Sequence, residues 1–261
     1  MIGVYDSGIG GLLLARKLGE RYADRCVSVF CDTAASGLAA RTLEQAAERC
    51  RSGLSYLTEQ GARLIVIACH ETVMDVLARP GKPSVPDLPL IDAVGVTARA
   101  TQSVSTGGRI GIITSRTVVE GGIYEPLLQT SAGEKALFFQ ACPLLLPLIE
   151  EGWYNTVATR MIIKRYLRPL KELQIDTLIP ACCSYQLVLP LIAARCGRRT
   201  RVVDPGGALI DAVAEQLVYD DTDGAHPGRP RYLVHVTQYH DGISRVLQTI
   251  FGRSTDRYEV L

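Results

Sequence analysis

The sequence lacks an excess of charge of either sign. Lysine and arginine number 28 against 27 aspartate and glutamate residues, so the formal net charge is +1 and no strong field attracts polyanions. The one basic cluster, between Arg195 and Arg201, is typical of a solvated loop. Nucleic acid is therefore not an expected partner.

Long apolar runs are also missing. No segment reaches the roughly 18–20 apolar residues that a membrane helix needs. Met1 leads directly into the strand-like segment Ile2–Tyr5, without the cationic region and apolar core of a secretory signal. We therefore expect a cytoplasmic protein that has no membrane partner.

The cysteines do not form metal or disulfide motifs. Eight cysteines in 261 residues are too sparse for a disulfide scaffold, no two of them stand in a CxxC pair, and only four histidines are present. Most of these thiols are expected to be buried as small apolar side chains. We therefore expect no metal site.

Short apolar runs alternate with longer amphipathic stretches, which predicts βα units around parallel sheets. The length suggests roughly two units of about 100–150 residues. The predicted strands are Ile2–Tyr5, Val27–Cys31, Leu64–Ala68, Leu90–Asp92, Arg109–Ile113, Ala136–Gln140, Thr177–Ile179, Arg201–Val203 and Arg231–Thr237. The predicted helices are Gly11–Arg21, Thr42–Gln60, Glu71–Ala78, Val94–Thr101, Ser115–Thr130, Thr156–Leu173, Leu187–Ala194, Gly207–Leu217 and Asp241–Phe251. An exposed loop is predicted at Gly224–Arg229.

The two halves share one arrangement. The segments Leu64–Cys69 and Leu178–Cys182 both run from an apolar strand into Ala-Cys, followed by polar residues that open a helix. Active sites of open α/β sheets gather at such strand ends, and the start of a helix favours a thiolate. Burial of both cysteines in the core is the alternative, but the repetition favours chemistry.

Four segments carry distinctive strings, namely Ile2–Leu12, Ile67–Cys69, Ala141–Gly152 and Ile175–Cys182. The most specific are Asp-Ser-Gly-x-Gly-Gly at Asp6–Gly11 and Ala-Cys-Pro-Leu at Ala141–Leu144. In this order and spacing the segments resemble glutamate racemases, members of the cofactor-independent aspartate/glutamate racemase superfamily, so no cofactor is expected. The resemblance implies an α/β protein with two similar Rossmann-like domains, whose parallel sheets face each other across an active-site cleft. We predict a first domain of 1–95 plus 208–261 and a second of 96–207. A homodimer is the assembly that the resemblance suggests.

The resemblance also implies a two-base reaction on a small, amino-acid-like substrate. In that family one cysteine removes the α-proton as a thiolate, and the other returns a proton to the opposite face. Cys69 and Cys182 match this pair, and two like groups let the reaction run both ways. Asp6 matches the carboxylate beside the first cysteine and Glu150 one near the second. Asp6 has an alternative role as a helix cap. Two more residues match family positions at the substrate, namely Ser7 and Asp32.

The sequence departs from the family at positions that contact the substrate. The family has Asn-Thr after the first cysteine, where this chain has His70-Glu71, so that a carboxylate would meet the substrate's α-carboxylate. After Cys182 the family has Thr-His-Tyr-Pro, where this chain has Cys183–Gln186 and lacks the assisting imidazole. The family's Pro-Tyr-Gly turn is replaced by Gly37–Ala39.

Several residues are candidates to replace the lost contacts. His70 is a candidate helper of Cys69, and Glu71 a candidate partner of a cationic or amide group on the substrate. Both are also explained as ordinary residues of a helix start. Thr117 stands beside Val118, which aligns with a substrate-binding threonine of the family. Two further candidate substrate contacts follow the second thiol, namely Cys183 and Ser184, although structural packing is an alternative for Cys183.

The favoured function is a cofactor-independent amino-acid racemase or epimerase, an isomerase, with a specificity changed from free glutamate. Three alternatives stay open. The first is an ordinary glutamate racemase that supplies D-glutamate for peptidoglycan. The second is a decarboxylase or isomerase of the same superfamily. The third is a binding homologue without catalysis.

Overall fold

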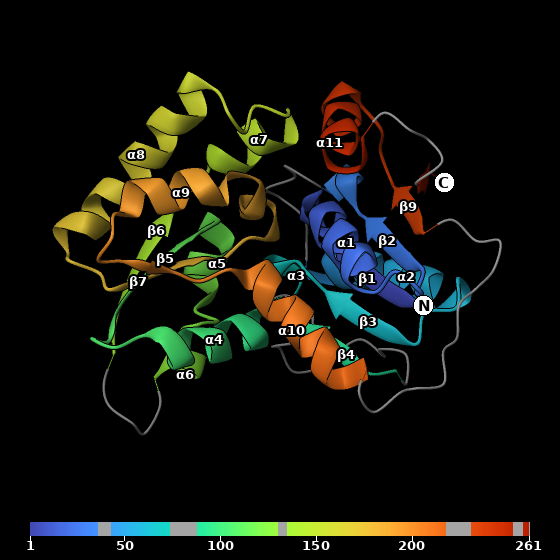
Figure 1. The fold of residues 1–261 in the computed structure, drawn as a ribbon, viewed down its shortest axis with the longest axis horizontal. Coiled ribbons are helices and arrows are strands. Elements are labelled where there is room, and N and C mark those ends of the chain that lie inside the picture. Colours follow the sequence, from blue (N-terminus) through green and yellow to red (C-terminus); the bar gives the residue numbers. More distant parts are fainter. Residues whose placement is uncertain (36–42, 74–87, 130–134, 218–230, 253–257, 261) are drawn as a thin grey trace.

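The structure, a computed structural model, describes all residues except 36–42, 74–87, 130–134, 218–230, 253–257 and 261. Two parallel sheets form its two halves (Figure 1). Sheet A contains β1 (Ile2–Asp6), β2 (Val27–Cys31), β3 (Leu64–Ile67), β4 (Leu90–Asp92), β9 (Tyr232–Val236) and β10 (Tyr258–Val260). Sheet B contains β5 (Arg109–Thr114), β6 (Ala136–Ala141), β7 (Thr177–Pro180) and β8 (Arg201–Val202). The strand orders are β10-β9-β2-β1-β3-β4 and β6-β5-β7-β8. The predicted α/β class with two parallel sheets is confirmed.

Helices cover the sheets. The first half has α1 (Gly10–Arg21), η1 (Thr33–Ala35), α2 (Leu43–Glu59), α3 (His70–Thr72) and α11 (Asp241–Phe251). The second half has α5 (Arg116–Gly121), α6 (Glu125–Leu128), α7 (Leu145–Glu150), α8 (Val157–Glu172), η3 (Cys183–Val188) and α9 (Leu189–Cys196). None of the helices in the described parts of the chain is long and apolar enough to cross a membrane.

The alternation of side chains along β1 separates two buried clusters. Val4 packs in one cluster with Leu12 of α1, while Tyr5 packs in the other with Leu54 of α2. Since successive strand residues point to opposite faces, α1 and α2 cover opposite faces of sheet A. Both clusters also contain residues of sheet B, so the cores of the two halves are continuous.

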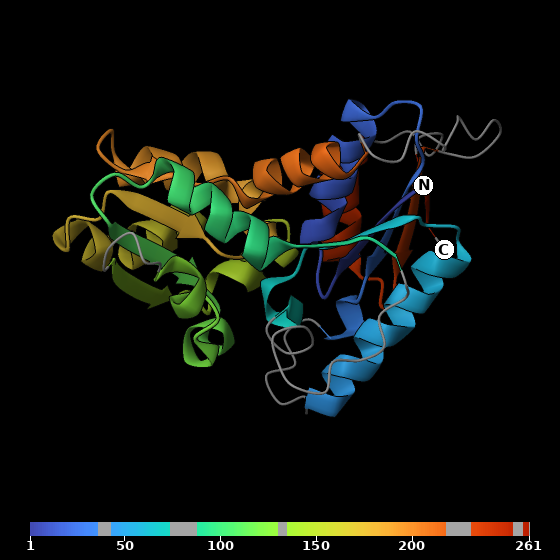
Figure 2. The same cartoon turned by 90° about the horizontal axis from the view of Figure 1, so that it is seen from below.

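Two helices link the halves. α4 (Ala93–Val104) follows β4 directly, and the Asp92 carboxylate caps it by accepting the Gly95 N–H at 2.7 Å. α4 packs alongside α10 (Pro205–Leu217), as Figure 2 shows. The predicted domain boundaries, at 95/96 and 207/208, fall inside these two helices. The division into domains stays a prediction.

Some predicted elements are wrong in detail. The helix predicted over Ser115–Thr130 is broken after α5, because Gly122 adopts a left-handed conformation with φ of 62° and ends the helix. The helix predicted over Leu187–Ala194 is a 3₁₀ turn, η3, followed by α9. The sequence pattern missed α7, a single short helix that contains Pro147, and it missed β10. The predicted loop Gly224–Arg229 and most of the predicted helix Glu71–Ala78 lie outside the described residues.

Candidate active site

The candidate active site lies where the carboxyl ends of β1, β3 and β7 come together. β1 ends at Asp6, β3 leads through Ala68 to Cys69, and β7 leads to Cys182. α1 follows β1 and packs directly against η3, which follows β7. The thiol of each half is therefore placed at a strand end beside the junction of the halves, where ligands of open α/β sheets bind.

Cys69 is partly buried, and its thiol lies 2.7 Å from the Ser7 hydroxyl. It occupies the N-cap position of α3 without a side-chain cap hydrogen bond. Burial, together with the charges of Asp6 and Glu71, raises the pKa of the Cys69 thiol to about 11, while the Ser7 hydroxyl and the Thr72 N–H lower it. Cys69 is therefore protonated near neutral pH, and Ser7 and the Thr72 N–H favour the thiolate once the proton leaves.

Cys182 has a similar environment in the second half. It is partly buried and occupies the N-cap position of η3 without a side-chain cap hydrogen bond, and the nearby Ser184 N–H lowers its pKa. Burial raises the pKa of Cys182 well above its ordinary value, and the charges of Cys69 and Asp6 raise it further. The effect of Cys69 on the pKa of Cys182 means that the two thiols lie within electrostatic range of each other.

Asp6 lies between the sheet and this pair. Its side chain is buried, and Oδ1 accepts the Gly8 N–H at 2.7 Å. Among the described residues, Oδ2 has no hydrogen-bond partner. Burial raises the pKa of Asp6 to about 7; the amides of Gly8 and Gly11 oppose this shift. The alternative role of Asp6 as the helix cap is wrong, because Ile9 is the N-cap residue of α1 and the Gly8 N–H that Asp6 binds lies before the helix. A carboxyl group that titrates near neutral pH is suited to exchange a proton with a neighbouring thiol.

Two further carboxylates border the site. A Cβ atom on Gly8 would lie 3.3 Å from Glu150 Oε1 and 3.5 Å from Asp6 Oδ1, so the absence of a side chain at Gly8 lets Glu150 approach Asp6. Glu71 of α3 raises the pKa of Asp6 and of both candidate thiols, which places its charge in the same space. The predicted pairing of Glu150 with Cys182 stays a prediction.

His70 is buried beside the site. Neither ring nitrogen has a hydrogen-bond partner within the described part of the chain, and the ring stacks on Tyr124 with 6.2 Å between centroids. Burial lowers the pKa of His70 to about 3, so the imidazole is neutral near pH 7. Ser7, rather than His70, contacts Cys69. The predicted help of His70 to Cys69 stays a prediction.

Two predicted substrate contacts have other surroundings. Asp32 is buried, and the guanidinium of Arg49 binds both of its oxygens, with 2.6 Å between Arg49 Nε and Asp32 Oδ2. Thr237 donates a further hydrogen bond to Asp32 at 2.9 Å. On α5 Val118 is buried and Thr117 is exposed. The substrate contacts of Asp32 and Thr117 stay predictions, without an observation in their favour.

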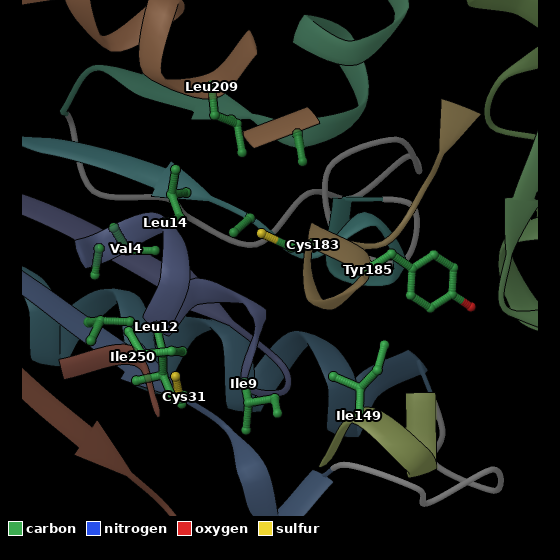
Figure 3. Close-up of a cluster of buried hydrophobic side chains, with 14 of the residues drawn as sticks. Val4, Ile9, Leu12, Leu14, Cys31, Ile149, Cys183, Tyr185, Leu209 and Ile250 are labelled. Atoms are coloured by element: carbon green, nitrogen blue, oxygen red, sulfur yellow. The ribbon is translucent and has the colours of Figure 1, made fainter. Parts of the chain in front are cut away.

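The side chains that follow Cys182 point in different directions. Cys183 and Tyr185 leave η3 in opposite directions (Figure 3). Cys183 packs in the core, Ser184 is buried, and the Ser184 N–H lowers the pKa of Cys182. Substrate contacts of Cys183 and Ser184 stay predictions, and the Gly37–Ala39 turn lies outside the described residues. The sequence analysis did not identify the backbone amides of Thr72 and Ser184 as groups that lower the pKa of the two thiols. The only sequence signal for such an amide is its position two or three residues after a cysteine.

Comparison with known proteins places this site in a family. No protein-family model matches the sequence. The glutamate racemase of Syntrophus aciditrophicus is 32% identical over 253 residues, which cover 97% of this chain and 93% of the relative. The chain belongs to the glutamate racemase family. It is therefore an isomerase by family, as the strings at Asp6–Gly11 and Ala141–Leu144 predicted.

Solved glutamate racemase structures share the fold. The Bacillus anthracis structure has a TM-score of 0.86 at 22% identity, and the match covers 100% of this chain and 96% of that one. The Francisella tularensis structure, a complex with D-glutamate, has a TM-score of 0.81 at 19% identity, with the same two coverages. At these identities the two structures support the two-sheet architecture alone.

Proposed function

We propose that this glutamate racemase family member inverts the α-carbon of an amino acid by proton transfer between Cys69 and Cys182, without a cofactor. One cysteine, as the thiolate, removes the proton from Cα, so the Cα–H bond breaks and an S–H bond forms. The thiol on the opposite face then gives its proton to Cα, and its S–H bond breaks. The cycle leaves the thiol and the thiolate exchanged, which is the starting state for the reverse reaction.

One observation carries this proposal. Cys69 and Cys182 are the two partly exposed cysteines of the chain, whereas the other six are buried. Both also stand at the start of a helical turn, where a backbone N–H lowers the pKa of each, and Cys69 raises the pKa of Cys182 electrostatically. Two accessible, coupled thiols from different halves are what a base on one face and an acid on the other require.

Two nearby groups control the protonation of the first thiol. Its high pKa means that Cys69 must lose a proton before it can act as a base. Asp6, with a pKa of about 7 and one oxygen that lacks a described partner, is the proposed acceptor. The Ser7 hydroxyl then donates a hydrogen bond to the resulting thiolate. Asp6 and Ser7 therefore act together on Cys69.

The proposed specificity rests on Glu71. Its charge raises the pKa of Asp6, Cys69 and Cys182 together, so it lies within electrostatic range of all three groups. An anion there repels the α-carboxylate of glutamate and attracts a cationic or amide group. We propose a neutral or basic amino acid, or an amide derivative, as the substrate. Ordinary glutamate racemisation is the second candidate, because the curated relative is a glutamate racemase.

Hydrogen exchange in heavy water tests both candidates. The protein is incubated with each enantiomer of glutamate, glutamine, lysine and alanine, and loss of the Cα–H signal is followed by NMR. The Cys69→Ser/Cys182→Ser double variant shows whether exchange depends on the two thiols, and a mock purification from the same host without the expressed protein is the control for contaminating racemases. Exchange and inversion of a neutral or basic amino acid, with slow exchange of glutamate, is the expected result.

The other outcomes have distinct meanings. Glutamate as the best substrate would overturn the changed specificity and leave the two-cysteine mechanism standing. Exchange that persists in the double variant would overturn the mechanism. No exchange with any of these amino acids would overturn the proposed function and favour a decarboxylase, an isomerase or a binding protein.

A further inference from the structure

Gln186, in the turn after Cys182, joins the two halves of the molecule. Its carboxamide is buried and makes two polar contacts. The carbonyl oxygen accepts a hydrogen bond from Lys17 Nζ of α1 at 2.9 Å, and the amide nitrogen donates one to Cys183 Sγ at 3.2 Å. A single side chain therefore ties α1 to the residue next to the second candidate thiol.

Two glycines leave room for this arrangement. A Cβ atom on Gly206 of α10 would overlap the Gln186 carboxamide, and a Cβ atom on Gly10 of α1 would overlap the backbone of Cys183 and Ser184. The helices α1 and α10 and the turn η3 are distant in sequence but pack closely together here. Such packing leaves little freedom for the turn to shift.

An acidic residue completes the arrangement. Asp204 Oδ2 lies 3.8 Å from Lys17 Nζ, and Asp204 Oδ1 accepts the Gly206 N–H at 3.0 Å. The Lys17 side chain is about one-third exposed, with a relative accessibility of 32%, so the ion pair alone contributes little to stability. Its geometric effect is larger, because it directs the ammonium group toward the buried Gln186.

We propose that Gln186 and Lys17 form a positioning pair that holds the η3 turn and, with it, Cys182 at the start of this turn. The inference rests on the proposed role of Cys182 in proton transfer. Gln186 is tied to Cys183, and the Ser184 backbone is wedged against Gly10, so the turn that follows Cys182 is held from both sides. A loosened turn moves the Ser184 N–H, which lowers the pKa of Cys182, away from the sulfur.

The pair acts on one thiol and not on the other. Cys69 lies 2.7 Å from the Ser7 hydroxyl, which follows β1, and the Thr72 N–H of α3 lowers its pKa. Neither contact involves Gln186 or Lys17. Cys69 therefore serves as an internal reference in the same molecule, since a general loss of packing would affect both thiols.

Alkylation by iodoacetamide, resolved by peptide mass spectrometry, measures the two thiols separately. Rates at Cys182 and Cys69 are compared across neutral to alkaline pH in the wild type, Gln186→Met and Lys17→Met. Lys17→Arg keeps a cationic donor, and Lys164→Met removes an exposed lysine of α8 as the matched control. Thermal unfolding checks that each variant is folded, and Lys17→Met provides a test at a more exposed position if Gln186→Met does not fold.

The expected result is an about 3- to 10-fold slower alkylation of Cys182 in both methionine variants, which is the effect of one net hydrogen bond on the thiolate population. The rate at Cys69 stays at the wild-type value, and Lys17→Arg and Lys164→Met behave as the wild type. An unchanged or faster reaction of Cys182, or an equal change at both thiols, would overturn the inference. The alkylation measurement uses no substrate, so its outcome does not depend on racemase activity.

Discussion

The Ser7 hydroxyl lies 2.7 Å from the Cys69 thiol, although 62 positions separate the two residues in the chain. Ser7 follows β1 and Cys69 follows β3, and these strands are parallel neighbours in sheet A. Parallel order brings the carboxyl ends of neighbouring strands to one edge of the sheet. The hydroxyl opposes the rise in the pKa of Cys69 that burial causes. Ser7, at the end of β1, therefore lowers the pKa of a thiol at the end of β3.

Replacement of Ser7 by alanine tests this relationship. Ser7→Ala removes a hydrogen bond to the thiolate, and such bonds to charged groups contribute about 1.5–3 kcal/mol. The pKa of Cys69 therefore rises further, and its alkylation by iodoacetamide near neutral pH slows by about 10-fold or more. Ser7→Thr keeps the hydroxyl and serves as the matched control. An equal rate in Ser7→Ala and the wild type would show that the contact does not stabilise the thiolate.

Replacement of each candidate thiol tests the two-base mechanism. Cys69→Ser and Cys182→Ser should each lower racemisation by about 10²–10⁴-fold or more, because loss of either the acid or the base blocks inversion. Initial rates of inversion from each enantiomer measure the effect, and circular dichroism checks the fold. Cys196→Ser, at a buried cysteine of α9, is the control and should keep the wild-type rate. If only Cys182 proves necessary, a one-thiol decarboxylase or isomerase becomes the better explanation.

Much of the fold could be predicted because buried parallel strands leave short apolar runs in the sequence. The segments Val27–Cys31 and Leu90–Asp92 match the observed strands at both ends. The errors occur where one residue overrides the pattern. Gly122 ends α5 early by adopting a positive φ, and the apolar period alone does not reveal such a stop.

The candidate site could be predicted in part. Cys69 and Cys182 stand out because each follows an apolar strand, and the structure places both at strand ends. The environment of His70 could not be predicted, since nothing in the string Cys-His-Glu indicates that the ring is buried without a described partner. The same holds for Gln186, whose partners Lys17 and Cys183 meet only through the contact between α1 and η3.

Replacement of Glu71 by threonine tests the proposed specificity. Glu71→Thr removes the carboxylate that acts on both thiols and restores the residue type of the family. Two unit charges at about 4 Å repel by a few kcal/mol at an effective dielectric constant of about 20. The ratio of kcat/KM for glutamate to that for the best neutral or basic amino acid should therefore rise by about 10-fold or more. Glu71→Gln, which keeps the size and removes the charge, separates the electrostatic from the steric contribution. An unchanged ratio in both variants would remove Glu71 from the specificity of the enzyme.

The burial of His70 predicts a loss of stability in acid. The pKa of His70 falls from an ordinary value of 6.5 to about 3 in the folded protein because the ring is buried. Between these values the unfolded chain binds a proton that the folded chain does not, so stability falls as the pH falls from 6.5 toward 3. His70 should therefore account for a loss on the order of 3 kcal/mol by about pH 4. Urea unfolding of the wild type and His70→Gln at about pH 7 and about pH 4 measures this loss.

His70→Gln should lose less stability between these two pH values than the wild type, whatever its stability at neutral pH, because glutamine does not titrate. Other groups keep part of the pH dependence. His235, stacked on Phe30 and tilted against Tyr56, also has its pKa lowered by burial. His240→Asn is the matched control, since it removes an exposed histidine and keeps a side-chain acceptor at the N-cap of α11. Equal losses in the wild type and His70→Gln would mean that His70 accepts a proton in the folded state. The imidazole would then be available to Cys69 as a base, and the predicted help of His70 to that thiol would gain its first support.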